Sequence, residues 1–345
     1  MQAGLQAAGE PAYRAGQAMH WFWRGLSPSF TSMRTLSPVA RQHLEAAYTF
    51  STVSPHLRRE ADHGGTIKYL FRLVDGRTIE TVVMHYEASS RSRRRTTICV
   101  SSQVGCPIGC GFCATGQSGF DRNLTEAEIV DQFLSASREL REQDRSLTNV
   151  VFMGMGEPMN NYAAVVGAIR RWARDDTLRF SPRRVTISTI GLVPFIERLS
   201  AEGLPVNLAI SLHAPDDELR TSMIPVNRKY PIAAIVTAAR AHSERTGRRT
   251  SYEYVLLNGV NDSVAQAQQL ARVVRHPLSH VNLIPMNPID GSPLQPPSRA
   301  RAGAFMAVLQ AAGVSTTIRV TRGLDIDAAC GQLRARQLSP LPSIT

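Results

Sequence analysis

The sequence predicts an α/β fold, a partial parallel (βα)6-type barrel that follows a small N-terminal helical domain and a β-hairpin. Two observations support this prediction. Short runs rich in β-branched and other apolar residues recur from residue 96 onward, and helix-like segments such as LTEAEIVDQFLSASREL separate most of them. Strands that alternate with helices form parallel βα units. Six or seven units are too few to close an eightfold barrel, so we expect an open one, with a doubly wound sheet as the structural alternative.

The chain before residue 96 carries two different patterns. Residues 1–60 contain helix-like stretches, one of which opens on Ser37 and Pro38, a helix-start signal, so we expect a helical accessory domain there. In residues 61–95, alternating apolar residues flank Asp75 and Gly76, which predicts a β-hairpin and, after it, a basic linker. The core then covers residues 96–337, and residues 338–345 are expected to form a disordered tail.

Polar motifs follow several of the predicted core strands at the point where each strand ends. The predicted strands are TTICV, NVVFMG, RVTIST, VNLAISL, SYEYVLL, VNLIPM and STTIRV. Since the loops at the carboxyl ends of barrel strands build the active site, we expect these motifs to share one site. Ordinary turn chemistry is the alternative for any one of them alone. The motifs are residues 154–158, Ser188, residues 211–213 and Asn287.

Composition restricts the cellular setting and the partner. The chain has 345 residues and a net charge of +11, which suits a polyanionic partner such as nucleic acid or simply a basic surface. No apolar signal-peptide region and no run long enough to span a membrane is seen in the sequence. Three of the five cysteines fall within eight residues, which is no disulfide framework, so we expect a cytoplasmic protein with no membrane partner.

Cys106, Cys110 and Cys113 have the spacing C-x3-C-x2-C. Three thiolates can hold three irons of a cubane [4Fe-4S] cluster and leave the fourth iron free to bind a small molecule. A zinc site completed by His213 is the competing interpretation.

The cysteine spacing, with Phe112 just before the last cysteine, resembles the signature of radical S-adenosylmethionine (SAM) enzymes. That resemblance implies that SAM chelates the open iron and is split into methionine and a 5′-deoxyadenosyl radical, and that the barrel is of the radical SAM type. A longer ordered set of motifs is similar to the RlmN/Cfr family of RNA adenine methyltransferases over about residues 78–334. The motifs are CVSSQVGC, FCATGQ, GMGEP, ISLHAP, IPMNP and DIDAACGQL.

The family resemblance implies a reaction that uses two SAM molecules per turnover. Cys330 would accept a methyl group, a radical formed on that methyl would add to the adenine, and Cys99 would attack the Cys330 sulfur to release the product, leaving a disulfide. Glu80 matches the family's proton acceptor. Without the resemblance, Cys330 is typical of a buried structural cysteine and Glu80 of an exposed strand carboxylate.

The resemblance also implies a set of SAM contacts. The sequence departs from the family at Ile190, where a serine is usual, so no contact is expected from that position. Residues 87–95 are richer in arginine than the family's segment, and either RNA contact or a solvated loop would explain them. The matched SAM-binding residues are Gly156, Glu157, Ser188, Ser211, Leu212, His213 and Asn287.

Arg322 and Gly323, which precede the DID motif, resemble the branch of the family that methylates C2 of adenine rather than C8. The implied substrate is 23S rRNA and, in some members, tRNA as well, with electrons from a donor such as flavodoxin or ferredoxin. A C8-specific rRNA methyltransferase of the Cfr type and a non-catalytic RNA-binding protein that carries zinc or a cluster are the alternatives.

Overall fold

The computed structural model describes residues 1–88, 93–289 and 291–333. Its centre is a ten-stranded sheet with the order β1-β2-β3-β4-β7-β8-β9-β10-β11-β12, of which β4 to β12 are mutually parallel. The partial parallel barrel is therefore confirmed. The parallel strands are β4 (Arg95–Cys99), β7 (Asn149–Phe152), β8 (Val185–Thr189), β9 (Asn207–Ser211), β10 (Thr250–Leu256), β11 (Ser279–Pro285) and β12 (Ser315–Ile318).

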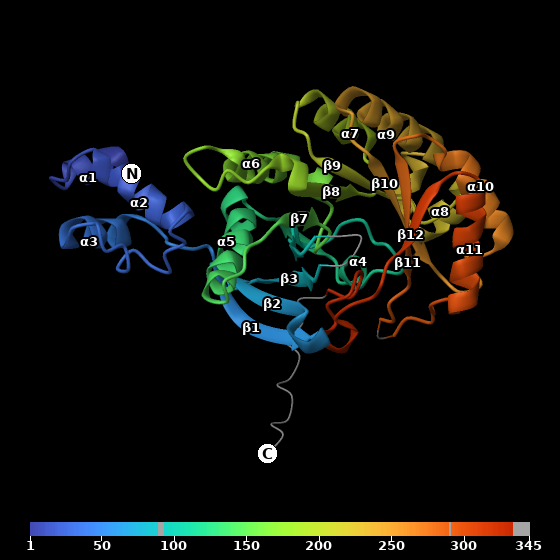
Figure 1. Ribbon diagram of the computed structural model, residues 1–345, viewed down its shortest axis with the longest axis horizontal. Coiled ribbons are helices and arrows are strands. Elements are labelled where there is room, and N and C mark those ends of the chain that lie inside the picture. Colours follow the sequence, from blue (N-terminus) through green and yellow to red (C-terminus); the bar gives the residue numbers. More distant parts are fainter. Residues whose placement is uncertain (89–92, 290, 334–345) are drawn as a thin grey trace, which may run out of the picture.

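Helices connect the parallel strands and lie along the outer face of the curved sheet (Figure 1). The helix after β4 starts where the sequence supplies a cap, because Thr125 and Glu128 form a capping box at the beginning of α5. The predicted helix LTEAEIVDQFLSASREL is thus confirmed. The core helices are α5 (Glu126–Glu142), α6 (Tyr162–Ala173), α7 (Val193–Ala201), α8 (Asp217–Met223), α9 (Ile232–Thr246), α10 (Val264–Val274) and α11 (Arg299–Ala311).

The predicted hairpin consists of β2 (Thr66–Leu73) and β3 (Thr78–Tyr86), which pair antiparallel around Asp75 and Gly76. Gly76 has φ 84°, which suits glycine in a tight turn. β3 also pairs antiparallel with β4, with Tyr86 opposite Arg95. The hairpin is therefore continuous with the barrel sheet, and its residues can reach the carboxyl end of the first parallel strand.

The prediction of helical structure up to residue 60 is wrong for its last part. Helices are α1 (Gln2–Ala7), α2 (Tyr13–Trp23) and α3 (Pro38–Ala47), and β1 (Val53–Ala61) is a strand paired antiparallel with β2. A register shift between Pro55 and Leu57 lets this edge strand accommodate its proline. Residues 53–61 are short and polar, so their sequence gives no clear strand signal. Their pattern of buried and exposed side chains comes from packing on the sheet.

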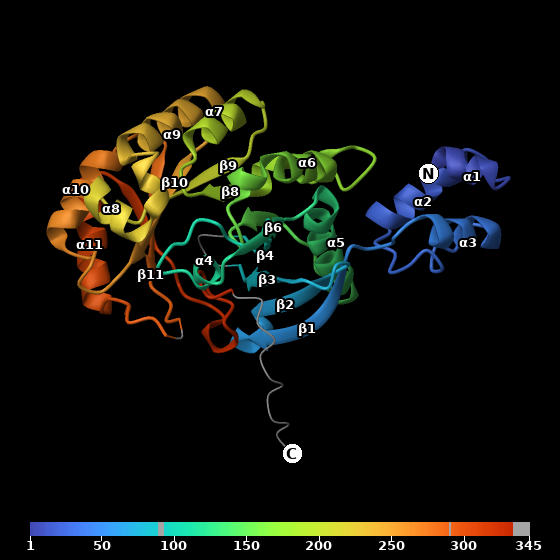
Figure 2. The same ribbon diagram turned by 180° about the vertical axis from the view of Figure 1, so that it is seen from behind.

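The three N-terminal helices stand to one side of the barrel (Figures 1 and 2). Ser37 caps α3 by accepting a hydrogen bond from Ala40 N at 3.0 Å, with Pro38 in the first turn, so this predicted helix start is confirmed. The helices enclose a small hydrophobic cluster of their own, which includes Leu5, Met33 and Leu44. No helix in the described ranges combines the length and apolar character that a bilayer crossing requires. The predicted tail, residues 338–345, and residues 89–92 of the predicted linker lie outside the described residues.

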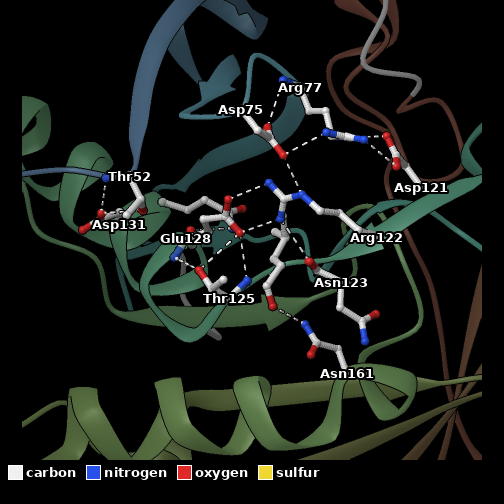
Figure 3. A network of polar contacts seen from close by, with 12 residues as sticks. Thr52, Asp75, Arg77, Asp121, Arg122, Asn123, Thr125, Glu128, Asp131 and Asn161 are labelled. Carbon is white, nitrogen blue, oxygen red and sulfur yellow. Dashed lines mark hydrogen bonds and ion pairs between the residues drawn. The ribbon is translucent and has the colours of Figure 1, made fainter. Parts of the chain in front are cut away.

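A charged network holds the hairpin turn against the segment that follows the cysteine motif (Figure 3). Arg122 donates to Asp75 Oδ2 at 2.7 Å and to both carboxylate oxygens of Glu128 at 2.8 and 2.9 Å. Arg77 pairs with Asp121, which lies on the short strand β6 (Phe120–Asn123). Each exposed ion pair adds little to the stability of the fold by itself. Because the arginines are shared between partners, they link the hairpin, β6 and α5.

Candidate active site

One cavity lies at the carboxyl ends of the parallel strands, as the placement of the polar motifs predicts. Ten of the thirteen predicted site residues line it; Leu212, Cys99 and Glu80 are not among the lining residues. The ten are Cys106, Cys110, Cys113, Gly156, Glu157, Ser188, Ser211, His213, Asn287 and Cys330.

The three motif cysteines lie on the loop between β5 (Gln103–Gly105) and α4 (Ala114–Gln117). Cys106 N donates to Gly119 O at 2.8 Å, which closes the loop at its base. Burial raises the pKa of all three thiols, that of Cys106 to about 12. Because buried thiolates need compensating positive charge, this donor set suits a metal cluster with one iron for each sulfur.

The geometry is less suited to a single metal ion. Within the described part of the chain, no group of three or more His, Cys, Asp or Glu side chains is arranged to hold one. His213, the predicted fourth zinc ligand, accepts a hydrogen bond from Val255 N through Nδ1 at 3.0 Å, and burial lowers its pKa to about 3. Its ring meets Phe112 edge-on at 4.9 Å, so a neutral imidazole packs beside the cysteine loop.

Cys330 reaches the cavity because the segment that carries it docks on the cysteine loop. Ala114 N donates to Gly331 O at 2.7 Å, and the Thr115 hydroxyl donates to Leu333 O at 2.6 Å. From the other side, Asn287 Nδ2 donates to Cys330 O at 2.9 Å. Both overall views place this red C-terminal segment beside α4 (Figures 1 and 2). The methyl-accepting candidate and the cluster candidate thus share one wall.

Arg319, directly after β12, donates from Nη1 to Cys330 Sγ at 2.9 Å. The proximity of the Cys330 sulfur is the main reason that the pKa of Arg319 is raised. Among the described residues that line the cavity, Arg319 is the one arginine or lysine. A guanidinium at this distance stabilises negative charge on sulfur.

Cys99 and Glu80 lie on neighbouring strands beside the cavity. Cys99 ends β4 opposite Val82 of β3, so its side chain and that of Glu80, two residues from Val82, project from the same face of the sheet. Burial raises the pKa of Cys99 to about 12, and the nearby Cys330 adds to the effect whereas Arg319 opposes it. The two cysteines and Arg319 therefore interact.

Glu80 is 3 % exposed, which rules out the exposed strand carboxylate considered from the sequence. Its Oε1 pairs with Lys68 Nζ at 3.0 Å, and Lys68 also donates to Asp327 O at 3.2 Å. Lys68 therefore connects Glu80 to the segment that carries Cys330.

The loop after β7 brings Gly156 and Glu157 to the cavity. Gly156 has φ 101°, and a Cβ there would lie 2.5 Å from Gln103 Cβ, so no other residue fits. The buried Glu157 carboxylate accepts hydrogen bonds from Met159 N at 2.9 Å and Ile190 N at 2.8 Å. Burial raises its pKa to about 7. Ile190, where the family resemblance predicted no contact, lines the cavity and holds Glu157 through its backbone.

Ser188 and Ser211 face each other across the ends of β8 and β9, with their hydroxyl oxygens 3.4 Å apart. Arg220, a fully buried arginine, fixes this edge. It donates to Leu212 O at 2.9 Å, Ser211 O at 3.0 Å and Ile190 O at 2.5 Å. Leu212 itself is buried behind the wall rather than lining it.

Four charged residues in or beside this site were not predicted from the sequence: Lys68, Arg220, Glu253 and Arg319. Glu253 lines the cavity from the middle of β10 and accepts from Asn282 Nδ2 at 2.7 Å, which leaves a buried carboxyl group on the inner wall. Glu253 could have been identified from the sequence, because it is a charged residue inside the otherwise apolar strand SYEYVLL.

Comparisons with known proteins agree with the family resemblance seen in the sequence. The model of the radical SAM superfamily matches residues 100–271. A probable dual-specificity RNA methyltransferase RlmN from Frankia alni is 48 % identical over 95 % of this chain and 79 % of that protein. Its counterpart from a strain of Thermus thermophilus is 45 % identical over 96 % and 92 %. The crystal structure of a radical SAM methyltransferase from Sphaerobacter thermophilus has TM-score 0.92 and 49 % identity, and covers 97 % of this chain and 96 % of its own. The chain therefore belongs to the RlmN family of dual-specificity RNA methyltransferases, within the radical SAM superfamily.

Proposed function

We propose that the protein methylates C2 of an adenine in 23S rRNA, and also in tRNA, by way of a methyl group carried on Cys330. The observation that carries the proposal is the position of Cys330: it lines the same cavity as the three cysteines of the motif, although it comes from the far end of the chain. An adenine ring carbon is a poor nucleophile, so a thiolate has to take the methyl group first.

We propose that Cys106, Cys110 and Cys113 hold a [4Fe-4S] cluster, which membership of the radical SAM superfamily implies together with SAM. When bound, the cluster and SAM supply the radical that removes a hydrogen atom from a methyl group. SAM-binding groups would be the backbone at Gly156, the Glu157 carboxylate, the Ser188 and Ser211 hydroxyls, and the His213 and Asn287 side chains, with Leu212 in the wall behind them. For Glu157, a carboxylate suits the positively charged amino group of SAM.

Three protein groups then have separate tasks around the adenine. Cys330 forms the S–CH3 bond as the bond from the SAM sulfur to that methyl breaks. Cys99 later attacks the Cys330 sulfur and releases the product, and the two cysteines end as a disulfide. Glu80 accepts the ring proton. Its Lys68 partner at 3.0 Å, which also holds Asp327 O, would keep that carboxylate in place beside the Cys330 segment.

Because the reaction needs electrons, we propose a small reduced electron carrier, such as flavodoxin or ferredoxin, as a partner in the cytoplasm. That carrier would also reduce the Cys99–Cys330 disulfide or leave that step to a dithiol.

Nucleoside mass spectrometry tests the proposal. The anaerobically reconstituted protein, given SAM, a reductant and protein-free 23S rRNA or tRNA, should yield 2-methyladenosine. Formation of 8-methyladenosine instead would assign the C8 reaction. Absence of any methylated adenosine from a protein that has its iron and cleaves SAM would overturn the proposal.

A further inference from the structure

Tyr86, at the end of the hairpin strand β3, carries two arginines. The guanidinium carbon of Arg95 lies 4.3 Å from the centre of the Tyr86 ring, and that of Arg322 lies 4.6 Å from it. Arg95 is the cross-strand partner of Tyr86 on β4, whereas Arg322 comes from the C-terminal segment after β12. Three separate parts of the chain therefore build this Tyr86 cluster, made up of Tyr86, Arg95 and Arg322.

The arginines of the Tyr86 cluster are held in place before any ligand arrives. Arg322 Nη1 donates to His85 O at 2.7 Å, and the next residue, Gly323, donates from its backbone N to Asp62 Oδ2 at 3.1 Å. A guanidinium that lies over an aromatic ring keeps its remaining N–H groups at its edge. Fixing a long side chain in advance lowers the entropy that binding would cost.

The two arginines of the cluster carry positive charge that no described carboxylate neutralises through an ion pair. In the parts of the chain that the structure describes, no carboxylate lies within ion-pair distance of Arg95 or Arg322, and Glu87 pairs with Arg145 at 3.7 Å instead. Burial is the main cause that depresses the pKa of His85, next to the cluster; Arg145, Arg94 and Arg322 depress it further, whereas Glu87 alone raises it, so cations outnumber carboxylates there. An excess of cations over carboxylates favours an anionic ligand.

The cluster adjoins the active site. Tyr86 and Arg322 line a small pocket together with Cys330, Arg319 and Asn287, and these last three also line the active-site cavity. Val320, beside Arg319, is 79 % exposed on the segment that forms this pocket. An adenine whose ring reaches Cys330 would therefore leave its sugar and phosphate near the Tyr86 cluster.

We propose that Arg95 and Arg322, held on the Tyr86 ring, bind a backbone phosphate of the RNA next to the target adenosine. The proposal rests on the proposed function, because it takes RNA as the ligand of the cavity. Guanidinium N–H groups match phosphate oxygens in geometry and charge, and contacts to phosphate position a nucleic acid without reading its sequence. The cluster thus sets where the target base enters, while the cavity selects the base.

Binding to RNA with single uncharged linkages tests the proposal. The cluster-loaded protein is titrated with an RNA hairpin that carries the target adenosine, either unmodified or with one methylphosphonate at each linkage around that adenosine. For the wild type, one or two of these linkages should weaken binding about tenfold. Arg95→Gln/Arg322→Gln should bind the unmodified RNA correspondingly weakly and should no longer respond to those linkages. Its plot of log affinity against log salt should be flatter by about 0.7, the value for one lost phosphate contact to single-stranded RNA.

Two further variants separate a phosphate contact from a general effect. Tyr86→Leu keeps both charges but removes their support, so its affinity should fall less than that of the arginine pair. Arg174→Gln/Arg179→Gln removes two exposed arginines that pair with Asp176 and Asp175, and it should leave affinity and salt slope unchanged. Thermal unfolding of each variant checks that the fold is intact.

A double variant of Arg95 and Arg322 that folds and binds with unchanged affinity and salt slope would overturn the proposal. So would one that still responds to the same methylphosphonate linkages. Methylation of Cys330 in the absence of RNA, measured on the same samples, distinguishes this result from failure of the proposed function. If the wild type methylates Cys330 and forms 2-methyladenosine but these RNA results are negative, only the phosphate contact is wrong.

Discussion

Arg319 Nη1 lies 2.9 Å from Cys330 Sγ, so the residue proposed to accept the methyl group has a cation as its direct partner. Arg319 is also close to Cys99 and Glu253, whose interactions add to the raised pKa of its guanidinium. A thiol is a weak nucleophile and a thiolate a strong one. The side chain of Arg319 therefore supplies a positive charge beside the proposed methyl acceptor, which is half-buried.

Replacing Arg319 by methionine should slow methylation of Cys330 by about 10- to 100-fold, the value of one charge-assisted hydrogen bond. Lysine at this position should recover part of the rate, since it restores charge without the planar geometry. The measurement is the mass of the Cys330 peptide after timed incubation with SAM. Arg174→Gln, at an exposed arginine that pairs with Asp176, is the control and should methylate Cys330 at the wild-type rate. Equal rates for Arg319→Met and the wild type would show that the contact has no part in this step.

The strands and the cavity could be predicted because their signals are local. The apolar runs mark each barrel strand, and the polar residues after them gather at one edge by the rules of parallel sheets. Arg319 was visible in the sequence only as part of the strand-like run STTIRV. Its contact with Cys330 depends on how the chain turns after β12, which no pattern of neighbouring residues specifies.

The pairing of Lys68 with Glu80 was hidden for a related reason. The two residues are diagonal neighbours on antiparallel strands, because Lys68 is opposite Val82 and Glu80 is opposite Leu70. The sequence predicts the hairpin, yet it does not show that both faces of β3 are covered. β1 was missed in the same way, since only its partner β2 explains why a segment containing Pro55 is a strand.

Glu80→Gln should stop formation of methylated RNA while leaving earlier steps intact. The amide keeps the size of the carboxylate but cannot accept a proton, so we expect product formation to fall at least 100-fold. Cys330 methylation and SAM cleavage should continue. The three quantities can be measured on one sample by nucleoside and peptide mass spectrometry. Glu60→Gln, on the edge strand β1, serves as the control. Normal turnover by Glu80→Gln would exclude Glu80 as the proton acceptor.

Each cysteine of the motif should be required for iron. We expect Cys106→Ala, Cys110→Ala and Cys113→Ala to lose most of their iron and all SAM cleavage, because three sulfurs are the whole protein ligand set proposed for the cluster. Iron analysis and visible absorption after anaerobic reconstitution measure this. Cys330→Ala lacks a sulfur in the same cavity and should keep its iron. Full iron content in any of the three motif variants would contradict the assignment.

Buried histidines should make the protein less stable in mild acid. His242 is fully buried and its pKa is lowered to about 4, whereas in the unfolded chain it titrates near 6.5. The unfolded state then binds the proton first as pH falls, so the stability from this group is present above pH 6.5 and is lost towards pH 4. Between pH 7.5 and 5.5, the free energy of unfolding should fall by about 1 kcal/mol more for the wild type than for His242→Gln. Urea unfolding at the two pH values measures this free energy. The variant His20→Gln, at an exposed histidine, should behave as the wild type does.

Cys99 and Cys330 should fail at different steps when each is replaced by alanine. Cys330→Ala has no thiolate to accept the methyl group, so neither methylated protein nor RNA attached to protein should form. Cys99→Ala can take the methyl on Cys330 and bond it to the adenine, but it lacks the sulfur that attacks Cys330. It should therefore accumulate RNA covalently joined through Cys330, seen on a denaturing gel as a slow band that nuclease removes. Cys99 ends the strand beside the hairpin and interacts with the Cys330 sulfur, so no other described cysteine outside the motif is placed to replace it. Normal turnover by Cys99→Ala, or a covalent adduct from Cys330→Ala, would show that the two roles are assigned wrongly even though the family is right.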